Sequence, residues 1–231
     1  MKKTLLLLLL AAASATAAHG QSRAGGSLSS KDYSKGSTDS RNTGFGVKGG
    51  YNYNNLRGDD ISGINRNSMS GFHAGVYGQL GLDNFSSVQV ELLYSRQGFG
   101  ADFTPSGSTN KQSYSYKMDY ISLPIMYVGN FTDNLSFHVG PQLSLLVNAN
   151  NGNSLALSEN GFHSFDYGGV AGLEARIGPA RVGARYNLSL GKIFQEPTTP
   201  LNANNAVAFG YKDKNLYNNL FQVYVGIGIT Q

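Results

Sequence analysis

The stretch Leu220-Phe221-Gln222-Val223-Tyr224-Val225-Gly226-Ile227-Gly228-Ile229-Thr230 alternates apolar residues with polar or small ones without a break. One face carries Phe221, Val223, Val225, Ile227 and Ile229. The other face carries Gln222, Tyr224, Gly226, Gly228 and Thr230. A period of two with one apolar face indicates a β-strand. The length is near the roughly 9–11 residues that a tilted transmembrane strand needs, so the stretch predicts a strand that crosses a membrane.

Seven earlier stretches show the same alternation. They lie at residues 44–54, 71–82, 85–98, a segment ending in 119–127, 135–146, 165–177 and 181–191. Pro124 and Pro141 fall inside two of these runs. Because proline cannot donate to a strand ladder, we expect β-bulges at both positions.

The connections between these stretches alternate between short and long. Short turns are expected at 82–84, 129–134 and 178–180, and long polar loops at 55–70, 100–113, 147–164 and 192–219. Short periplasmic turns and long extracellular loops are typical of outer-membrane barrels. The sequence therefore predicts an all-β fold, an eight-stranded antiparallel up-and-down transmembrane β-barrel, with both termini on the periplasmic side. A soluble barrel is the alternative, with its apolar faces turned inward.

The chain begins with the three-part layout of an export signal. Met1-Lys2-Lys3 is followed by the leucine run Leu5–Leu10 and by the small residues of Ala11–Ala18. This layout predicts a signal peptide over residues 1–20; an N-terminal membrane anchor is the alternative. Residues 21–43 are rich in Ser, Gly and charge, which predicts a flexible periplasmic arm. Residues 44–231 form the expected barrel domain.

Composition narrows the range of functions. Charged residues make up 14% of the chain, against about 25% in soluble domains. The basic excess precedes residue 44, so no basic stripe accompanies the barrel and no nucleic-acid partner is expected. The absence of cysteine excludes disulfides and thiolate metal sites. We expect no cofactor and no metal.

Charged side chains recur on the polar faces of the predicted strands. They are Lys48, Glu91, Glu174, Arg176 and Arg185. Eight strands enclose a lumen just wide enough for side chains to fill, so a passive pore is not expected. These residues are predicted to form a polar network in the lumen that braces the wall. A proton or ion path is the alternative role.

A hydrolytic function would need a nucleophile, a base and an orienting acid within hydrogen-bond reach. Ser136 and His138 lie two residues apart on one strand face, but they match no named motif. We predict that the chain is not an enzyme. An outer-membrane lipid hydrolase using Ser136 and His138 is the alternative.

Six short segments, in order, resemble the PorT-like outer membrane β-barrel family of Bacteroidetes. They are Gly46–Asn52, Gly71–Tyr77, Val90–Gly98, Tyr120–Ile125, Gly140–Ser144 and Arg185–Gly191. The resemblance implies a small outer-membrane barrel. That family is named after a component of a machinery that secretes proteins across the outer membrane. The expected role is therefore structural or protein-interacting, with a link to such secretion. The expected partners are outer-membrane lipid, lipopolysaccharide and periplasmic or secretion-complex proteins.

Overall fold

The computed structural model describes residues 42–58, 64–83, 85–103, 112–150, 154–155, 162–193 and 215–230. The predicted signal peptide at 1–20 and the predicted arm, apart from Asn42 and Thr43, lie outside these residues. Among the described residues, no helix has the length and apolar character needed to cross a membrane.

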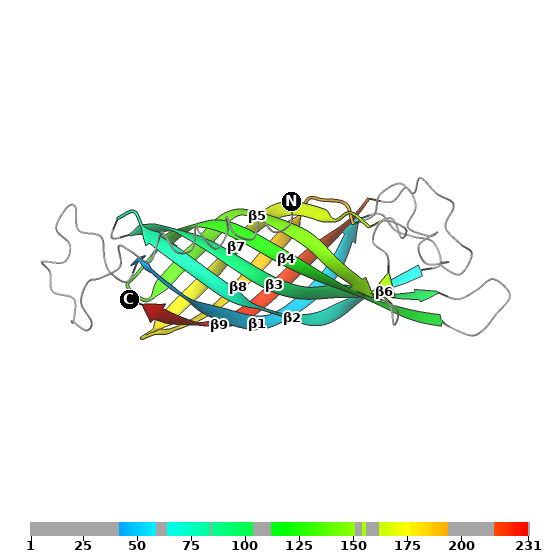
Figure 1. Ribbon diagram of the computed structural model, residues 1–231, viewed down its shortest axis with the longest axis horizontal. Coiled ribbons are helices and arrows are strands. Elements are labelled where there is room, and N and C mark those ends of the chain that lie inside the picture. The colour runs from blue at the N-terminus through cyan, green and yellow to red at the C-terminus, as the bar shows by residue number, and fades with distance from the viewer. Residues whose placement is uncertain are drawn as a thin grey trace, which may run out of the picture.

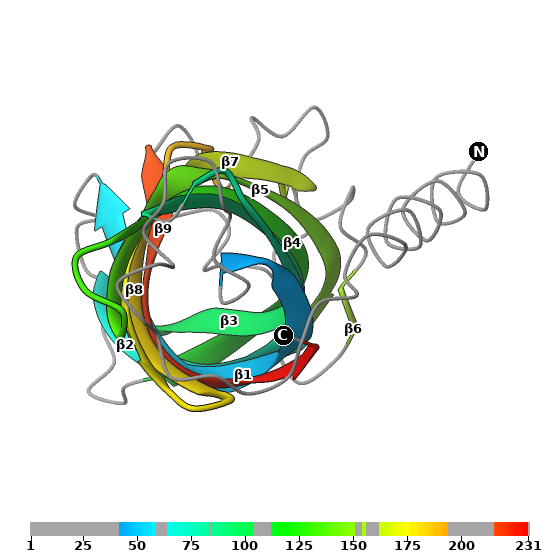
Figure 2. The same cartoon turned by 90° about the vertical axis from the view of Figure 1, so that its left-hand side faces the viewer.

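Eight long antiparallel strands form a closed barrel in the described part of the chain (Figures 1 and 2). They are β1 (Gly44–Gly58), β2 (Ile64–Gly81), β3 (Ser86–Phe103), β4 (Gln112–Asn130), β5 (Leu135–Asn150), β7 (Phe165–Ile177), β8 (Ala180–Ser189) and β9 (Leu216–Thr230). The short strand β6 (Ser154–Leu155) pairs with the end of β5. Each long strand pairs with its neighbour in chain order, and β1 pairs with β9 to close the sheet. The predicted fold class is confirmed.

Several strands run further toward the loop side than predicted. Part of the predicted loop at 55–70 is paired strand, because Ile64 of β2 lies opposite Phe103 of β3. Phe103 in turn lies opposite Gln112 of β4. The apolar alternation is lost here because both strand faces carry polar residues, such as Arg66 on one face and Asn67 on the other, while the backbone ladder continues.

The expected bulges at the two prolines are wrong. Pro124 lies opposite Gln142 and Tyr127 lies opposite Val139, so β4 and β5 keep one register across this region. A proline removes a donor without adding a residue, so the strands need not shift. The register shifts lie elsewhere, one of them between Asp119 and Tyr120.

The turn between β2 and β3 is held by a single carboxylate. Asp83 Oδ1 accepts hydrogen bonds from the amides of Phe85 and Ser86, both at 2.7 Å. Its Oδ2 accepts from the Ser86 hydroxyl at 2.6 Å. These bonds, the hydroxyl foremost, lower the pKa of the Asp83 carboxyl below its usual value.

The outer wall is apolar and the lumen is polar over most of the barrel. Along β9, Phe221, Val223, Val225, Ile227 and Ile229 are exposed, whereas Gln222 and Tyr224 are buried. Exposed aromatic side chains lie near both ends of this wall: Tyr51, Tyr53, Phe72 and Tyr167 toward the loops, and Phe45, Phe85, Tyr127 and Phe131 toward the turns. An apolar band between aromatic girdles is the surface that a transmembrane barrel presents to lipid. The soluble alternative is therefore excluded.

The loop-side end of the interior is filled by a cluster of buried, mostly apolar side chains, here called the apolar cap. It comprises Leu56, Phe99, Tyr116, Met118, Tyr120, Leu146, Ala149, Phe162, Ile193 and Leu216. The rings of Phe99 and Tyr116 stack with centroids 5.1 Å apart. A backbone hydrogen bond of 2.9 Å from Ile193 to Leu216 joins the segment after β8 to the start of β9. The cap closes this end of the barrel.

Candidate functional site

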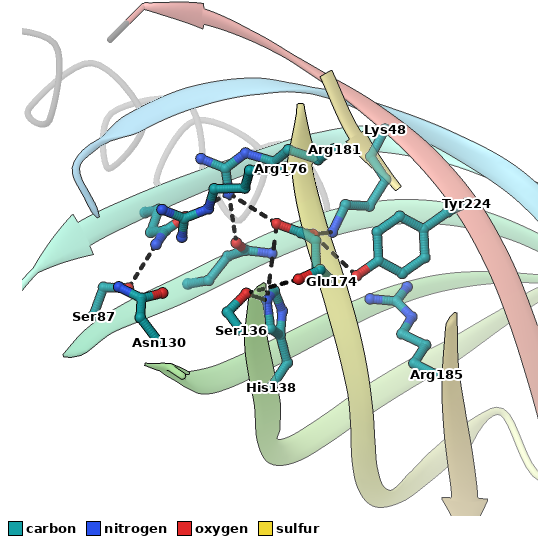
Figure 3. Close-up of polar contacts among 12 residues, drawn as sticks. Lys48, Ser87, Asn130, Ser136, His138, Glu174, Arg176, Arg181, Arg185 and Tyr224 are labelled. Atoms are coloured by element: carbon teal, nitrogen blue, oxygen red, sulfur yellow. Dashed lines mark hydrogen bonds and ion pairs between the residues drawn. The ribbon is translucent and has the colours of Figure 1, made fainter. Parts of the chain in front are cut away.

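Four strands bring charged side chains together in the turn-side half of the lumen. Lys48 Nζ on β1 donates to Glu91 Oε1 on β3 at 2.7 Å and lies 3.4 Å from Glu174 Oε2 on β7. Arg185 Nη1 on β8 donates to Glu91 Oε2 at 2.6 Å. The side chains of Lys48, Glu91 and Glu174 are 0% exposed. These residues, with Arg181 described below, are called the charge cluster. Figure 3 labels all of its members except Glu91.

Two tyrosines enclose the lysine of the cluster. Lys48 Nζ lies 4.0 Å from the ring centroid of Tyr224 and 5.4 Å from that of Tyr77. The Tyr224 hydroxyl donates to Glu174 Oε2 at 3.0 Å. Glycine makes room for the tyrosine side chain, since a Cβ on Gly183 would lie 2.4 Å from Cζ and from the hydroxyl oxygen of Tyr224. Aromatic faces and carboxylates together replace the hydration that the buried ammonium has lost.

Sequence reasoning missed Arg181 as a member of the cluster. Its Nη1 donates to Gln79 Oε1 at 2.6 Å and to Glu174 Oε1 at 3.2 Å. Arg181 is an even number of residues from Arg185 on one strand, so the two side chains share the inward face. That alternation is the signal that could have found it. Arg181 begins the predicted strand, where no alternation precedes it.

Arg176 lies apart from the other predicted residues, at the turn-side mouth of the barrel. Its Nη1 donates to Asn42 Oδ1 at 3.2 Å. Asn130 Nδ2 donates to the same oxygen at 2.8 Å, and Asn42 Nδ2 donates to the carbonyl oxygen of Asp83 at 3.0 Å. Asn42 thereby joins β7 to two turns. The structure thus brings four of the five predicted residues together and places Arg176 nearer the rim.

A chain of amides continues from the charge cluster toward the loop side. Arg185 Nε donates to Gln222 Oε1 at 2.6 Å, and Gln222 Nε2 donates to Asn52 Oδ1 at 2.7 Å. Asn52 Nδ2 then donates to the carbonyl oxygens of Phe72 and Arg96 at 3.0 and 2.9 Å. A guanidinium can only donate and a carbonyl can only accept, so both ends fix the direction of every bond between them.

Ser136 and His138 lie beside the charge cluster. Ser136 Oγ is 3.1 Å from His138 Nε2, and Glu174 Oε1 is 3.8 Å from the same nitrogen. In a hydrolytic triad the acid contacts the other ring nitrogen and leaves Nε2 for the nucleophile. Both side chains are buried, with Ser136 1% and His138 3% exposed. The contact braces the wall but lacks the order that a triad needs.

The described residues hold no group of three or more His, Cys, Asp or Glu side chains suited to a metal ion. In this geometry the cluster pairs two carboxylates with three cations, which leaves a net charge of +1. All five residues are buried, and each carboxylate faces at least two cations. Buried charges persist when they are paired and hydrogen-bonded in this way.

Comparison with known proteins agrees with this geometry. The sequence model of the family described as outer membrane protein beta-barrel domain matches residues 21–195. The fold and the family together define the class of protein: an outer-membrane β-barrel. The chain belongs to the outer membrane protein beta-barrel domain family, and its location is the outer membrane.

Solved structures similar to the chain include three bacterial proteins. The attachment invasion locus protein Ail of Yersinia pestis, in complex with the heparin analogue sucrose octasulfate, is 13% identical with a TM-score of 0.45, covering 81% of this chain and 99% of that one. Neisserial surface protein A is 18% identical with a TM-score of 0.44, covering 79% and 96%. OprG of Pseudomonas aeruginosa is 12% identical with a TM-score of 0.45, covering 82% and 97%. No curated protein sequence matches the chain.

Proposed function

We propose that this barrel works through its surfaces and not through its lumen, as a non-enzymatic outer-membrane protein with a structural or protein-interaction role. One observation carries the proposal: the interior is occupied along its length. The charge cluster and its amides fill the turn-side half, and the apolar cap fills the loop-side end. Eight-stranded barrels have no spare width once side chains fill them. Within the part of the chain that the structure describes, solutes therefore have no path through the lumen.

We further propose that the chain is a PorT-like barrel of Bacteroidetes and that it serves secretion across the outer membrane. The six ordered segments named above support it. In this proposal residues 1–20 are a signal peptide, residues 21–43 are a periplasmic arm, and residues 44–231 are the barrel domain. The place of Asn42 supports the arm, because the Asn42 side chain bonds to Asp83 and Asn130 at the turn-side mouth of the barrel, where the described part of the chain begins.

The test is affinity purification of the mature protein from outer membranes in mild detergent. The variant replaces residues 21–41 by a Gly/Ser segment of equal length and keeps Asn42. The matched control carries the same replacement in residues 104–110 of the β3–β4 loop. We expect reproducible periplasmic partners with the wild type and the loop control, and their loss with the arm variant. An unchanged partner set in the arm variant would contradict periplasmic docking.

A strain lacking the protein tests the link to secretion. We expect secreted proteins to accumulate in its periplasm and to reach the medium again when the wild-type gene is restored. Normal secretion in the deletion strain would remove the proposed link to secretion and leave the structural role.

A further inference from the structure

The outer face of the barrel has a hollow inside its apolar band. It spans β7, β8, β9 and β1 and has a volume of about 610 Å³. Small outward residues, among them Gly49, Ala175 and Ala184, form its floor, and larger ones such as Tyr51, Leu173 and Val223 form its sides. Because this face meets the hydrocarbon of the bilayer, a ligand in the hollow must be apolar.

Arginine and tyrosine side chains lie on two of the same strands, closer to the loops. Arg57 of β1 is exposed and lies opposite Tyr217 of β9. The guanidinium carbon of Arg57 lies 5.0 Å from the ring centroid of Tyr217, and Nη2 donates to the carbonyl oxygen of Ser189 on β8 at 3.3 Å. Arg66 of β2 donates to the carbonyl oxygen of Gly58, at the end of β1, at 3.5 Å. Two cations therefore lie beside one strand end.

The heights of the hollow and the arginine fit a single lipid. Figure 1 shows β9 and β1 side by side. From Tyr51 to Arg57 strand β1 rises about 15 Å along the membrane normal, at roughly 3.3 Å per residue and a tilt of about 40°. The apolar band of such a barrel is about 25 Å tall. The loop-side edge of the hollow, at Tyr51, belongs to the loop-side aromatic girdle, so Arg57 lies beyond the apolar band on the side of the polar headgroups.

Aromatic side chains lie between the hollow and Arg57. Tyr53 of β1, Tyr186 of β8 and Phe221 of β9 are exposed on the same face. The Tyr51 hydroxyl is hydrogen-bonded to the Ser70 hydroxyl of β2. From the membrane interior toward the loops, this face therefore presents the apolar hollow, then the aromatic side chains, and then the Arg57 guanidinium. This order matches an acyl chain, the interface and an anionic headgroup.

We propose that this face binds a phosphorylated glycolipid of the outer leaflet, of the lipopolysaccharide class. An acyl chain lies in the hollow, and a phosphate accepts hydrogen bonds from the Arg57 guanidinium. Guanidinium groups suit phosphate because they present paired donors in one plane. The Tyr217 ring holds the Arg57 guanidinium in place. This site is independent of the proposed protein partners.

The barrel supplies its own control for this site. Arg96 also points outward near the loop-side girdle, but Asp119 neutralises it through Nε at 2.7 Å and Nη2 at 3.2 Å. A neutral pair has little attraction for a phosphate. Substitutions of Arg57 and Arg96 therefore compare an outward arginine that has no paired carboxylate among the described residues of the site with one that Asp119 neutralises.

The experiment uses the mature protein folded in detergent and titrated with purified lipopolysaccharide, with binding followed by native mass spectrometry. We expect Arg57→Gln to weaken binding about fivefold, the effect of one cation near a charged membrane surface, and Arg96→Gln to leave it unchanged. Ala184→Leu, which fills the hollow and keeps Arg57, should also weaken binding. Retention of the heat-dependent gel mobility will show that each variant is folded.

Three comparison ligands test whether the site recognises the phosphate of a glycolipid or phosphate from another source. Dephosphorylated lipopolysaccharide and phosphatidylethanolamine should bind more weakly than intact lipopolysaccharide, and millimolar inorganic phosphate should not displace it. Equal binding of the dephosphorylated glycolipid, or equal losses in Arg57→Gln and Arg96→Gln, would overturn the proposal. Full displacement by inorganic phosphate would also overturn it, because the site would then be a simple anion site.

Discussion

The two ends of the lumen are stabilised in opposite ways. On the turn side, buried charges and amides bond to one another, whereas on the loop side mostly apolar side chains pack as in a soluble core. Strand β4 contains both patterns. Ile121 and Ile125 are exposed on its outer face around the buried Ser122, but nearer the loops Lys117 is exposed and Met118 is buried.

The medium outside the barrel explains why the outward and inward faces exchange their apolar and polar residues between the two ends. Where lipid covers the wall, apolar residues face outward and polar ones are left for the lumen. Above the membrane water covers the wall, and apolar residues gain by turning inward. The change falls next to the register shift between Asp119 and Tyr120. A single barrel is thus a membrane protein over one part of its length and a water-soluble protein over the other.

The largest expected effect comes from breaking the charge cluster. Glu174→Ala removes the carboxylate that pairs with Arg181 and one of the two that pair with Lys48. It should lower the free energy of unfolding by about 3–5 kcal/mol, as removal of one partner from a buried ion pair does. Urea unfolding of the detergent-folded protein, followed by circular dichroism, measures this. A loss below about 1 kcal/mol would mean that the cluster is hydrated and weakly coupled.

The corresponding change in the apolar cap is Met118→Ala. Met118 is fully buried, and truncation of such a side chain costs about 2–5 kcal/mol through lost burial and the cavity left behind. The same unfolding assay applies, and Lys117→Ala, on the opposite face of β4, is its control. If both variants lose the same stability, the loop-side end is not a packed core.

A smaller effect is expected for Ser136→Ala. Loss of the bonds to His138 Nε2 and to the carbonyl oxygen of Glu174 should cost about 1 kcal/mol, the net value of a typical hydrogen bond. Phospholipid hydrolysis by the purified protein should be at background for both wild type and variant. Hydrolysis by the wild type that the variant abolishes would revive the hydrolase alternative.

The smallest effect is expected at the boundary between the two regions. The Arg96 side chain is 40% exposed and its pair with Asp119 lies on the outer wall. Exposed pairs contribute about 0.2–1 kcal/mol, so Arg96→Gln should shift the unfolding midpoint only slightly. A loss comparable with that of Glu174→Ala would show that this boundary is buried in the folded protein.

The sequence predicts the wall of this barrel well because strand alternation is a local property. It places Lys48, Glu91, Glu174 and Arg185 on inward faces, but their pairing depends on how far each strand is offset from the next, which alternation does not encode. Arg176 shows this, since it shares the inward face of β7 with Glu174 yet bonds at the mouth.

The apolar cap could not be predicted in the same way. Phe162 and Ile193 come from segments read as polar loops, and they join β1, β3, β4, β5 and β9 only in three dimensions. The strand extensions above the membrane carry polar residues on their outer face. The alternation with apolar residues outward therefore ends there, although the strands remain hydrogen-bonded to their neighbours.

The most direct measurement is the conductance of the purified protein in a planar lipid bilayer. A lumen filled by the charge cluster and closed by the apolar cap predicts no steady channel current from the wild type at moderate voltage. A reproducible single-channel conductance, unaffected by charge substitutions in the loops, would contradict a closed lumen and the surface-based function that depends on it.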